Sequence, residues 1–278
     1  GDDTPVAVLS SHFRPVSHYF RQNFSQVTNP PIDSLRENKV MSLKTRFGNL
    51  GNILDFDNLT EENIYVLDSP ILTNSQFKKF KKFFSKKVKV IDCTFDIHGS
   101  LKERIELIRE EAETAVREGS TCLVLSDKNI SNQKASIPSI LTVGAVHSHL
   151  VKHGLRGYCS LNVECSDAMD THSFAILIGV GATTVNPYLA IDSIYQRFEK
   201  KLFGKSDFET CVSKFKKSID AGLLKIMSKM GISVISSYRG GCNFEAVGLS
   251  RAIVSDYFPG MSSRISGIGI IGIEKKIK

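Results

Sequence analysis

The chain has 278 residues and a formal charge of +7, from 36 Lys and Arg against 29 Asp and Glu, and 41% of its residues are hydrophobic. These values are ordinary for a globular protein and exclude collagen-like, low-complexity and intrinsically disordered classes. No apolar run approaches the roughly 18–20 residues that span a bilayer, so the sequence predicts neither a transmembrane helix nor a membrane partner.

The six cysteines form no CxxC pair, and the first twelve residues lack a basic segment followed by an apolar one. We therefore expect reduced thiols, no signal peptide and a cytoplasmic location, or the plastid stroma in a photosynthetic eukaryote. The chain begins with Gly1 instead of Met, which is typical of a processed product or of a piece of a longer protein.

Residues 1–86 show a less regular pattern than the rest of the chain. The adjacent prolines of VTNPPID (27–33) predict an extended or turn-like segment. RFGNLGNIL (46–54) predicts a loop or a hairpin because it contains two Gly-Asn steps.

The positive charge is concentrated in one segment, because residues 78–89 hold seven lysines and no acid and the rest of the chain is formally neutral. Phe77, Phe80, Phe84 and Val88 recur there at helical spacing. We predict that the phenylalanines point inward and the lysines outward, as a solvated amphipathic face. Contact with a nucleic acid or with an acidic membrane surface is the less favoured alternative, since phosphate attraction requires only clustered lysines.

From residue 87 onward, short apolar runs alternate with amphipathic segments. One well-capped example is the helix expected at 101–119, with Ser100 at its start and Gly119 at its end. Strands are predicted at 87–95, 121–127, 160–165, 183–186 and 232–236. Helices are predicted at 101–119, 137–153, 172–179, 187–203, 207–230 with an interruption at Gly222, 240–248 and 250–258.

This alternation predicts an α/β fold with a mostly parallel sheet and covering helices. About five strands follow residue 87, whereas a complete (β/α)8 barrel needs eight. We therefore expect an incomplete or modified (β/α) barrel.

Three glycines, Gly267, Gly269 and Gly272, match the letters of the GxGxxG dinucleotide motif. That motif needs a following helix and an acidic residue roughly 20 positions further on. Because the given sequence stops at Lys278, we expect neither, and the match carries almost no weight.

Histidines cluster in VHSHLVKHG, where His149 and His153 share a helical face in the manner of two metal ligands. His147 points elsewhere, and no nearby carboxylate or thiolate is visible in the sequence, so surface or structurally bonded histidines are the favoured interpretation and no metal is expected.

Cys242 follows Gly240 and Gly241 at a predicted helix start, where a thiolate could be stabilised. A free structural cysteine is favoured there. Arg239, just before it, could meet an anion or brace the turn. The residues alone therefore show an α/β domain without a complete catalytic constellation.

Several stretches, in order along the chain, resemble the central domain of the glutamate synthase large chain. The most specific are VTNPPID, the GAVHSHL region, and SKMGIS followed by SYRG. Others are DDTPVAVLS, MSLKTRFGNLGNIL, SPILT, HSFAILIGVGATTVNPYLAID and SYRGGCNFEAVGLS.

The resemblance implies a role in making glutamate from glutamine and 2-oxoglutarate. In that family an amidotransferase domain releases ammonia, which passes through a tunnel to an FMN barrel beside an iron–sulfur cluster. The central domain connects the two, resembles the FMN barrel in topology, and is not itself catalytic.

On this basis residues 1–278 are one central domain, of which 261–278 begin a linker to the FMN domain. The resemblance implies that the partners are the amidotransferase and FMN domains of the parent chain, and that this segment has no catalytic residue, no metal and no bound cofactor. The residues proposed for interdomain contact are Asn29, Pro30, Pro31, Asp33, Arg36, Ser237, Tyr238, Arg239, Gly240 and Arg264.

The sequence departs from the family at Gly241, Cys242 and Asn243, where the family usually has Ala-Gln-Ile, and at GMSSRISG near the end. These changes affect the expected details of a domain contact. The alternative function is a free-standing phosphate- or flavin-binding degenerate barrel, with Arg239 and the predicted helix start at Gly240 as its anion site.

Overall fold

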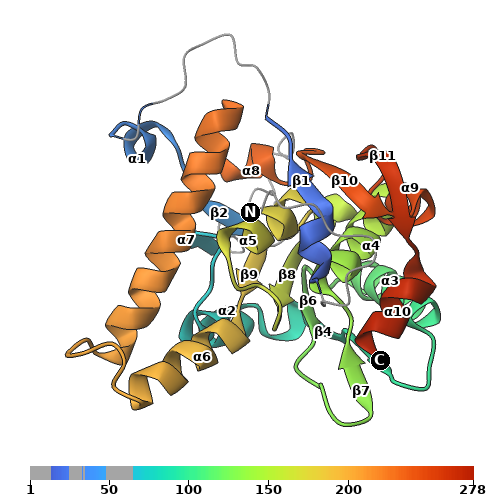
Figure 1. The fold of residues 1–278 in the computed structure, drawn as a ribbon, viewed down its shortest axis with the longest axis horizontal. Helices are drawn as coiled ribbons and strands as arrows, with labels where there is room; N and C mark the ends of the chain where they lie inside the picture. Colours follow the sequence, from blue (N-terminus) through green and yellow to red (C-terminus); the bar gives the residue numbers. More distant parts are fainter. Residues whose placement is uncertain (1–13, 25–32, 34, 48–64) are drawn as a thin grey trace.

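A computed structural model describes residues 14–24, 33, 35–47 and 65–278, and a four-stranded parallel sheet lies at its centre (Figure 1). The strands follow chain order, β4-β6-β8-β9, and each pair is parallel. Their bounds are β4 (Val88–Asp92), β6 (Cys122–Ser126), β8 (Ser160–Glu164) and β9 (Thr184–Asn186). All four strands were predicted from sequence, and the predicted α/β class is confirmed.

Helices α3 (Leu101–Arg117), α4 (Ser139–Lys152) and α5 (Thr171–Gly179) each connect one strand to the next and pack as neighbours on one face of the sheet. The predicted caps of α3 are present, because the Ser100 hydroxyl accepts from the Glu103 amide and Gly119 follows the helix with a φ of 95°. Strand β6 is wholly buried, as expected for a strand covered on both sides.

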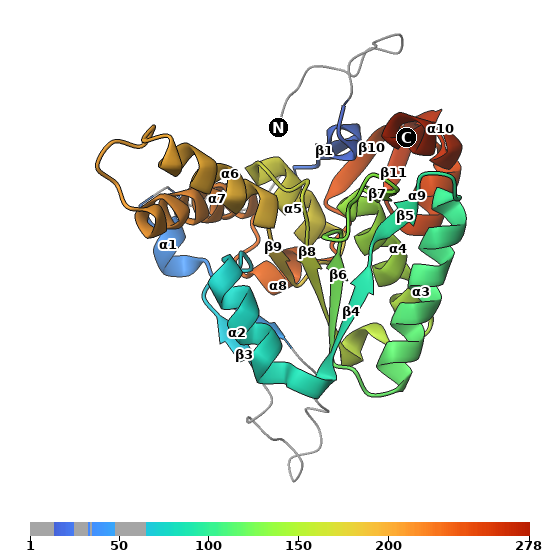
Figure 2. The same cartoon turned by 90° about the horizontal axis from the view of Figure 1, so that it is seen from below.

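Helix α2 (Asn74–Phe84) covers the opposite face (Figure 2). Its buried Phe77, Phe80 and Phe84 pack with Cys122 and Val124 of β6, whereas the alternate β6 residues belong to the main core. In a closed barrel this face would be the interior. Here α2 fills it, and within the described residues the four strands do not close into a barrel.

The predicted inward orientation is confirmed for Phe77, Phe80 and Phe84, all of which are buried. Five of the seven lysines are exposed, whereas Lys81 and Lys89 are half-buried. The capping box of Thr73 and Gln76 fixes the start of the helix.

Two predicted elements near the C-terminus are wrong. The segment 232–236 is not a strand: it makes a single bridge between Val234 and Ser42 and then turns into α8 (Ile235–Tyr238). The predicted helix 240–248 is instead β10 (Phe244–Leu249), because Gly240 and Cys242 both have positive φ and turn the chain. Strand β10 then pairs with β1 (Phe20–Gln22) and β11 (Ser262–Ile268).

The predicted interruption at Gly222 is also absent, because α7 (Phe208–Met230) runs through it. A Cβ at this position would lie 2.5 Å from the Thr171 side chain, so the glycine permits close approach of α5 and α7. The helix predicted at 250–258 is confirmed as α9 (Arg251–Tyr257), and the one opened by Pro187 as α6 (Tyr188–Glu199).

Residues 261–278, expected to begin a linker, contain β11 and α10 (Ile270–Ile277), and α10 packs on α3. Whether this region leads to an FMN domain stays a prediction.

The remaining elements are short: α1 (Glu37–Val40), β2 (Thr45–Phe47), β3 (Tyr65–Leu67), β5 (Thr94–Asp96), β7 (Lys134–Ser136), and 3-10 turns at Val16–Tyr19, Ser85–Lys87 and Arg156–Tyr158. The loop or hairpin predicted at 46–54 lies mostly outside the described residues, although β2 and β3 on either side of residues 48–64 pair antiparallel. None of the helices in the described ranges combines the length and the apolar character that a membrane span requires.

Candidate functional site

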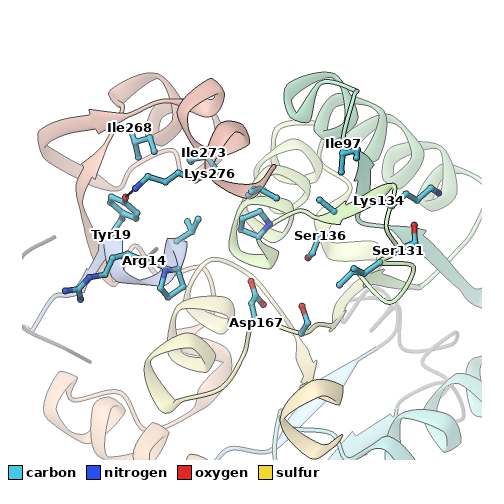
Figure 3. Close-up of a pocket in the computed structure, with 17 residues that line it drawn as sticks. Arg14, Tyr19, Ile97, Ser131, Lys134, Ser136, Asp167, Ile268, Ile273 and Lys276 are labelled. Carbon is cyan, nitrogen blue, oxygen red and sulfur yellow. Dashed lines mark hydrogen bonds between the residues drawn. The ribbon is translucent and has the colours of Figure 1, made fainter. Parts of the chain in front are cut away.

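A cavity of about 430 Å³ lies at the carboxyl ends of β6 and β8 (Figure 3). Ile268 and Ile273 from β11 and α10 form one wall, and Ile97 after β5 forms another. The carboxylate of Asp167 faces this space. In parallel sheets with crossover helices, ligands bind at the carboxyl ends of the strands. The position of the cavity is therefore that of a ligand or active site.

Two carboxylates hold the loops around the cavity, Asp167 in its lining and Asp127 bonded to the lining residues Ser136 and Ser166. Asp127 is buried, and its Oδ2 accepts from the Ser136 hydroxyl (2.9 Å) and the Ser166 amide (3.0 Å). Asp167 accepts from the amide of Ser139 (2.9 Å) and thereby caps the start of α4, although burial raises the pKa of its carboxyl. These carboxylates tie the loops after β6 and β8 to α4.

The cavity does not assemble a nucleophile with a base. Among the described residues that line it there is no histidine or cysteine, so no Ser–His or Cys–His pair forms there. The lining combines the Asp167 carboxylate with the cations Arg14, Lys134 and Lys276. Among its described residues there is no glycine, so it lacks the glycine-rich backbone loop that cradles a phosphate.

The predicted contact residues divide into an inward and an outward set. Tyr238 is fully buried and its hydroxyl donates to Gln22 Oε1 at 2.8 Å. Arg239 donates from Nε to the carbonyl of Ala182 at 3.0 Å. Arg239 was expected either to bind an anion or to brace the turn, and the hydrogen bond to Ala182 is a bracing contact. The helix predicted to begin at Gly240, which would have completed an anion site, is absent.

The outward set comprises Ser237, Gly240, Asp33, Arg36 and Arg264. Arg36 pairs with Asp33 at 2.5 Å, and this pair lowers the pKa of the Asp33 carboxyl. Arg264 is 84% exposed and lies 3.5 Å from Glu245. Among the described residues no hydrogen bond joins the Asp33–Arg36 pair to the 237–240 segment. Asn29, Pro30 and Pro31 lie outside the described residues.

A half-buried cluster of two arginines and one histidine, Arg156, Arg239 and His147, lies next to the 237–243 loop. Arg156 donates from Nε to Nδ1 of His147 (3.2 Å) and from a terminal nitrogen to the carbonyl of Gly181 (2.9 Å). Burial, followed by the charges of Arg156 and Arg239, lowers the pKa of His147 to about 4. His147 is therefore neutral at pH 7 and accepts the arginine's hydrogen bond.

The histidines at 149 and 153 have a neighbour that the sequence did not reveal. Glu113 of α3 lies 2.6 Å from His149 Nε2 and 3.9 Å from His153 Nδ1. The expectation of no nearby carboxylate is therefore wrong, because helix packing brings Glu113 from a different element. The position of Glu113 near the C-terminal end of the predicted helix 101–119 is the sequence signal that could have indicated this carboxylate.

The GxGxxG glycines have packing roles. A helix does follow the motif, contrary to expectation, with Gly269 at its N-cap. A Cβ on Gly267 would lie 2.2 Å from the Gly248 carbonyl oxygen, so this glycine permits close approach of β10 and β11. All six cysteines are free thiols, and Cys242 alone among them is exposed.

The sequence matches the family described as the glutamate synthase central domain over residues 1–250. The chain belongs to this family. It is 56% identical over 280 residues to the glutamate synthase [NADPH] large chain of Azospirillum brasilense, covering 100% of this chain and 18% of that protein.

More distant relatives of the central domain include two further large proteins. Identity is 42% to the glutamate synthase [NADPH] large chain of Bacillus subtilis (97% of this chain, 18% of that protein). The chain is 41% identical to ferredoxin-dependent glutamate synthase 1 of Arabidopsis thaliana, which is described as chloroplastic/mitochondrial. That match covers 96% of this chain and 17% of that protein. The chain thus spans less than a fifth of the length of these relatives.

Solved structures show only a weak likeness to this central domain. A flavocytochrome b2 mutant with pyruvate bound aligns with a TM-score of 0.41 and 16% identity, over 63% of this chain and 39% of that one. A similarity of this size is too low to support a functional comparison.

Proposed function

We propose that this chain is the non-catalytic central domain of a glutamate synthase large chain, where it connects an amidotransferase domain to an FMN domain and supports ammonia channelling between them. The observation that carries the proposal is the 56% identity to a large chain across the full length of this sequence. The matched region is a small share of that relative, which leaves ample length for two further domains.

The geometry of the 237–243 loop supports a contact role. Asn243 donates to the Tyr238 carbonyl at 2.6 Å, and Gln22 donates to the Asn243 carbonyl at 2.9 Å. Together with Arg239, these bonds fix the loop while Ser237 and Gly240 remain at the surface. A loop held in one conformation can present its backbone to a neighbouring domain without a large ordering cost.

In this proposal the chemistry resides outside the chain. A flavin and an iron–sulfur cluster supply the electron transfer in the parent enzyme, and the residues described here bind and orient the neighbouring domains. The location is then that of the parent enzyme, in the cytoplasm or in the plastid stroma of a photosynthetic eukaryote.

Binding of the separately produced flanking domains tests the connecting role. The chain is immobilised, and the amidotransferase and FMN domains of the Azospirillum large chain are passed over it. We expect both to bind, and we expect Arg264→Glu or Arg36→Glu to weaken the binding of at least one. Lys82→Glu is the matched control, because the lysine face is predicted to remain in water. The proposal would be contradicted if the amidotransferase domain, the FMN domain or both failed to bind.

No specific observation favours the alternative of a free-standing phosphate- or flavin-binding barrel. Arg239 is engaged with a carbonyl, and no glycine is among the described residues that line the cavity at the strand ends. A saturable change in the FMN absorption spectrum on adding the purified chain would support that alternative. Absence of a nucleic-acid partner stays a prediction, tested by salt-dependent DNA binding that requires residues 78–89.

A further inference from the structure

The C-terminal ends of α3 and α4 carry a cluster of metal-ligating side chains that no function considered so far uses. Glu113, His149 and His153 each offer one ligand atom, and the three atoms lie within 4.8 Å of one another. The two helices pack side by side (Figure 2), and their C-termini lie at the opposite end of the sheet from the cavity. The cluster is therefore separate from the site described above.

We propose that Glu113, His149 and His153 form a binding site for a divalent transition metal ion, with Zn²⁺ as the best match. Two imidazoles and one carboxylate are a donor set that zinc, nickel and copper prefer over magnesium and calcium. Three protein ligands leave one coordination position of a tetrahedral ion for water.

The carboxylate is held in an orientation suited to coordination. Arg117 binds Oε1 of Glu113 through two nitrogens, at 2.7 and 2.8 Å. Oε2 is left to face the histidines, at 2.6 Å from His149 Nε2. Such an outer partner, which fixes a ligand without touching the metal, is a regular feature of metal sites.

The histidines come from one helical face and need only a small movement. Their ring centroids are 4.3 Å apart. His153 Nδ1 now bonds to the His149 carbonyl at 2.8 Å, and coordination at this nitrogen would exchange that hydrogen bond for a metal bond. Bonds near 2.0–2.2 Å at a tetrahedral ion place the ligand atoms about 3.4 Å apart. The 3.9 Å from this nitrogen to Glu113 Oε2 must therefore shorten by about half an ångström, and the 2.6 Å from His149 Nε2 to Glu113 Oε2 must lengthen by about 0.8 Å.

The surroundings also favour a cation. Glu113 lies one turn before the end of α3, His149 lies in the last turn of α4, and His153 is the C-cap residue of α4. The carbonyl ends of two helices carry partial negative charge, which attracts positive charge. The ligands are partly accessible, with side-chain exposures of 22%, 19% and 35%, so an ion can enter and leave. A bound ion would tie α3 to α4.

Zinc titration of the full 278-residue chain tests the site. The experiment uses Cys242→Ser as the background, because that exposed thiol binds zinc by itself. We expect one Zn²⁺ per chain by isothermal titration calorimetry, and a rise in melting temperature with Zn²⁺ but not with Mg²⁺. Co²⁺ should give the visible absorption of a tetrahedral site.

Two variants separate this cluster from other sites. His153→Ala and Glu113→Gln should each weaken binding by more than about tenfold, the smaller cost seen even for outer-shell partners. His98→Ala, which removes an exposed histidine elsewhere, should leave affinity unchanged. Failure of Zn²⁺ to bind, or equal binding by His153→Ala and its parent, would overturn the proposal. Circular dichroism of each variant confirms that the fold is retained.

Discussion

Acidification should destabilise the chain through His147, whose ring accepts a hydrogen bond from the half-buried Arg156. The pKa of His147 is lowered to about 4 in the folded chain, against an ordinary value of 6.5 in the unfolded one. The unfolded state therefore binds a proton first as the pH falls, and the free energy of unfolding decreases between pH 6.5 and 4. The full effect is about 3 kcal/mol, of which about 2 kcal/mol appears between pH 7 and pH 5.

The assay is urea unfolding at pH 7, 6 and 5, followed by circular dichroism, for the chain and its His147→Gln variant. The glutamine amide oxygen can still accept from Arg156 Nε, but it does not titrate. Other titrating groups are present in both proteins, so their contribution cancels in the difference. We expect the free energy of unfolding of the parent chain to fall by about 2 kcal/mol relative to that of the variant from pH 7 to pH 5. A constant difference between them across this range would refute the reasoning, and exposed His98→Gln is the control.

Two further predictions concern packing. Gly267→Ala should lower the free energy of unfolding by about 1–3 kcal/mol, because its Cβ would overlap the Gly248 backbone; Gly269→Ala, with its nearest neighbour at 3.9 Å, should change it by less than about 0.5 kcal/mol. Phe80→Ala should cost about 3–5 kcal/mol because the ring is fully buried, whereas Phe83→Ala, at 49% exposure, should cost about 1 kcal/mol. Denaturant unfolding measures both pairs, and equal effects within either pair would contradict the packing described.

The sequence predicts the sheet well because its signals are local. Strand β6 is a continuous apolar run, and α3 carries a capping serine, an apolar face and a terminal glycine. Each of these features is readable within about twenty residues. The four strands of the sheet and the helices that follow them are accordingly present as expected.

The errors at 232–248 arise where distant segments decide the structure. Strand β10 forms because Phe244 and its neighbours pair with β1, more than 200 residues earlier in the chain. Among the described residues, 232–234 have no such partner beyond a single bridge to Ser42, and they do not form a strand despite their β-branched side chains. Local propensity is overridden by tertiary contacts in both cases.

The candidate site was predictable only in part for the same reason. The sequence predicts Tyr238 and Arg239 as interdomain contacts, and it does not reveal their inward orientation, which depends on contacts with Gln22 and Ala182. Glu113 joins His149 and His153 only when α3 packs on α4. Sequence spacing shows residues that share a helix face, and it does not show what faces them.

The most direct test of the central claim is the coupling between ammonia release and glutamate synthesis in a complete large chain that carries this domain. The measured quantity is the ratio of glutamine hydrolysed to 2-oxoglutarate reduced. We predict a ratio near one for the parent chain, and free ammonia with a raised ratio for Arg264→Glu or Arg36→Glu. An unchanged ratio in both variants, together with unchanged binding of the flanking domains, would contradict the account.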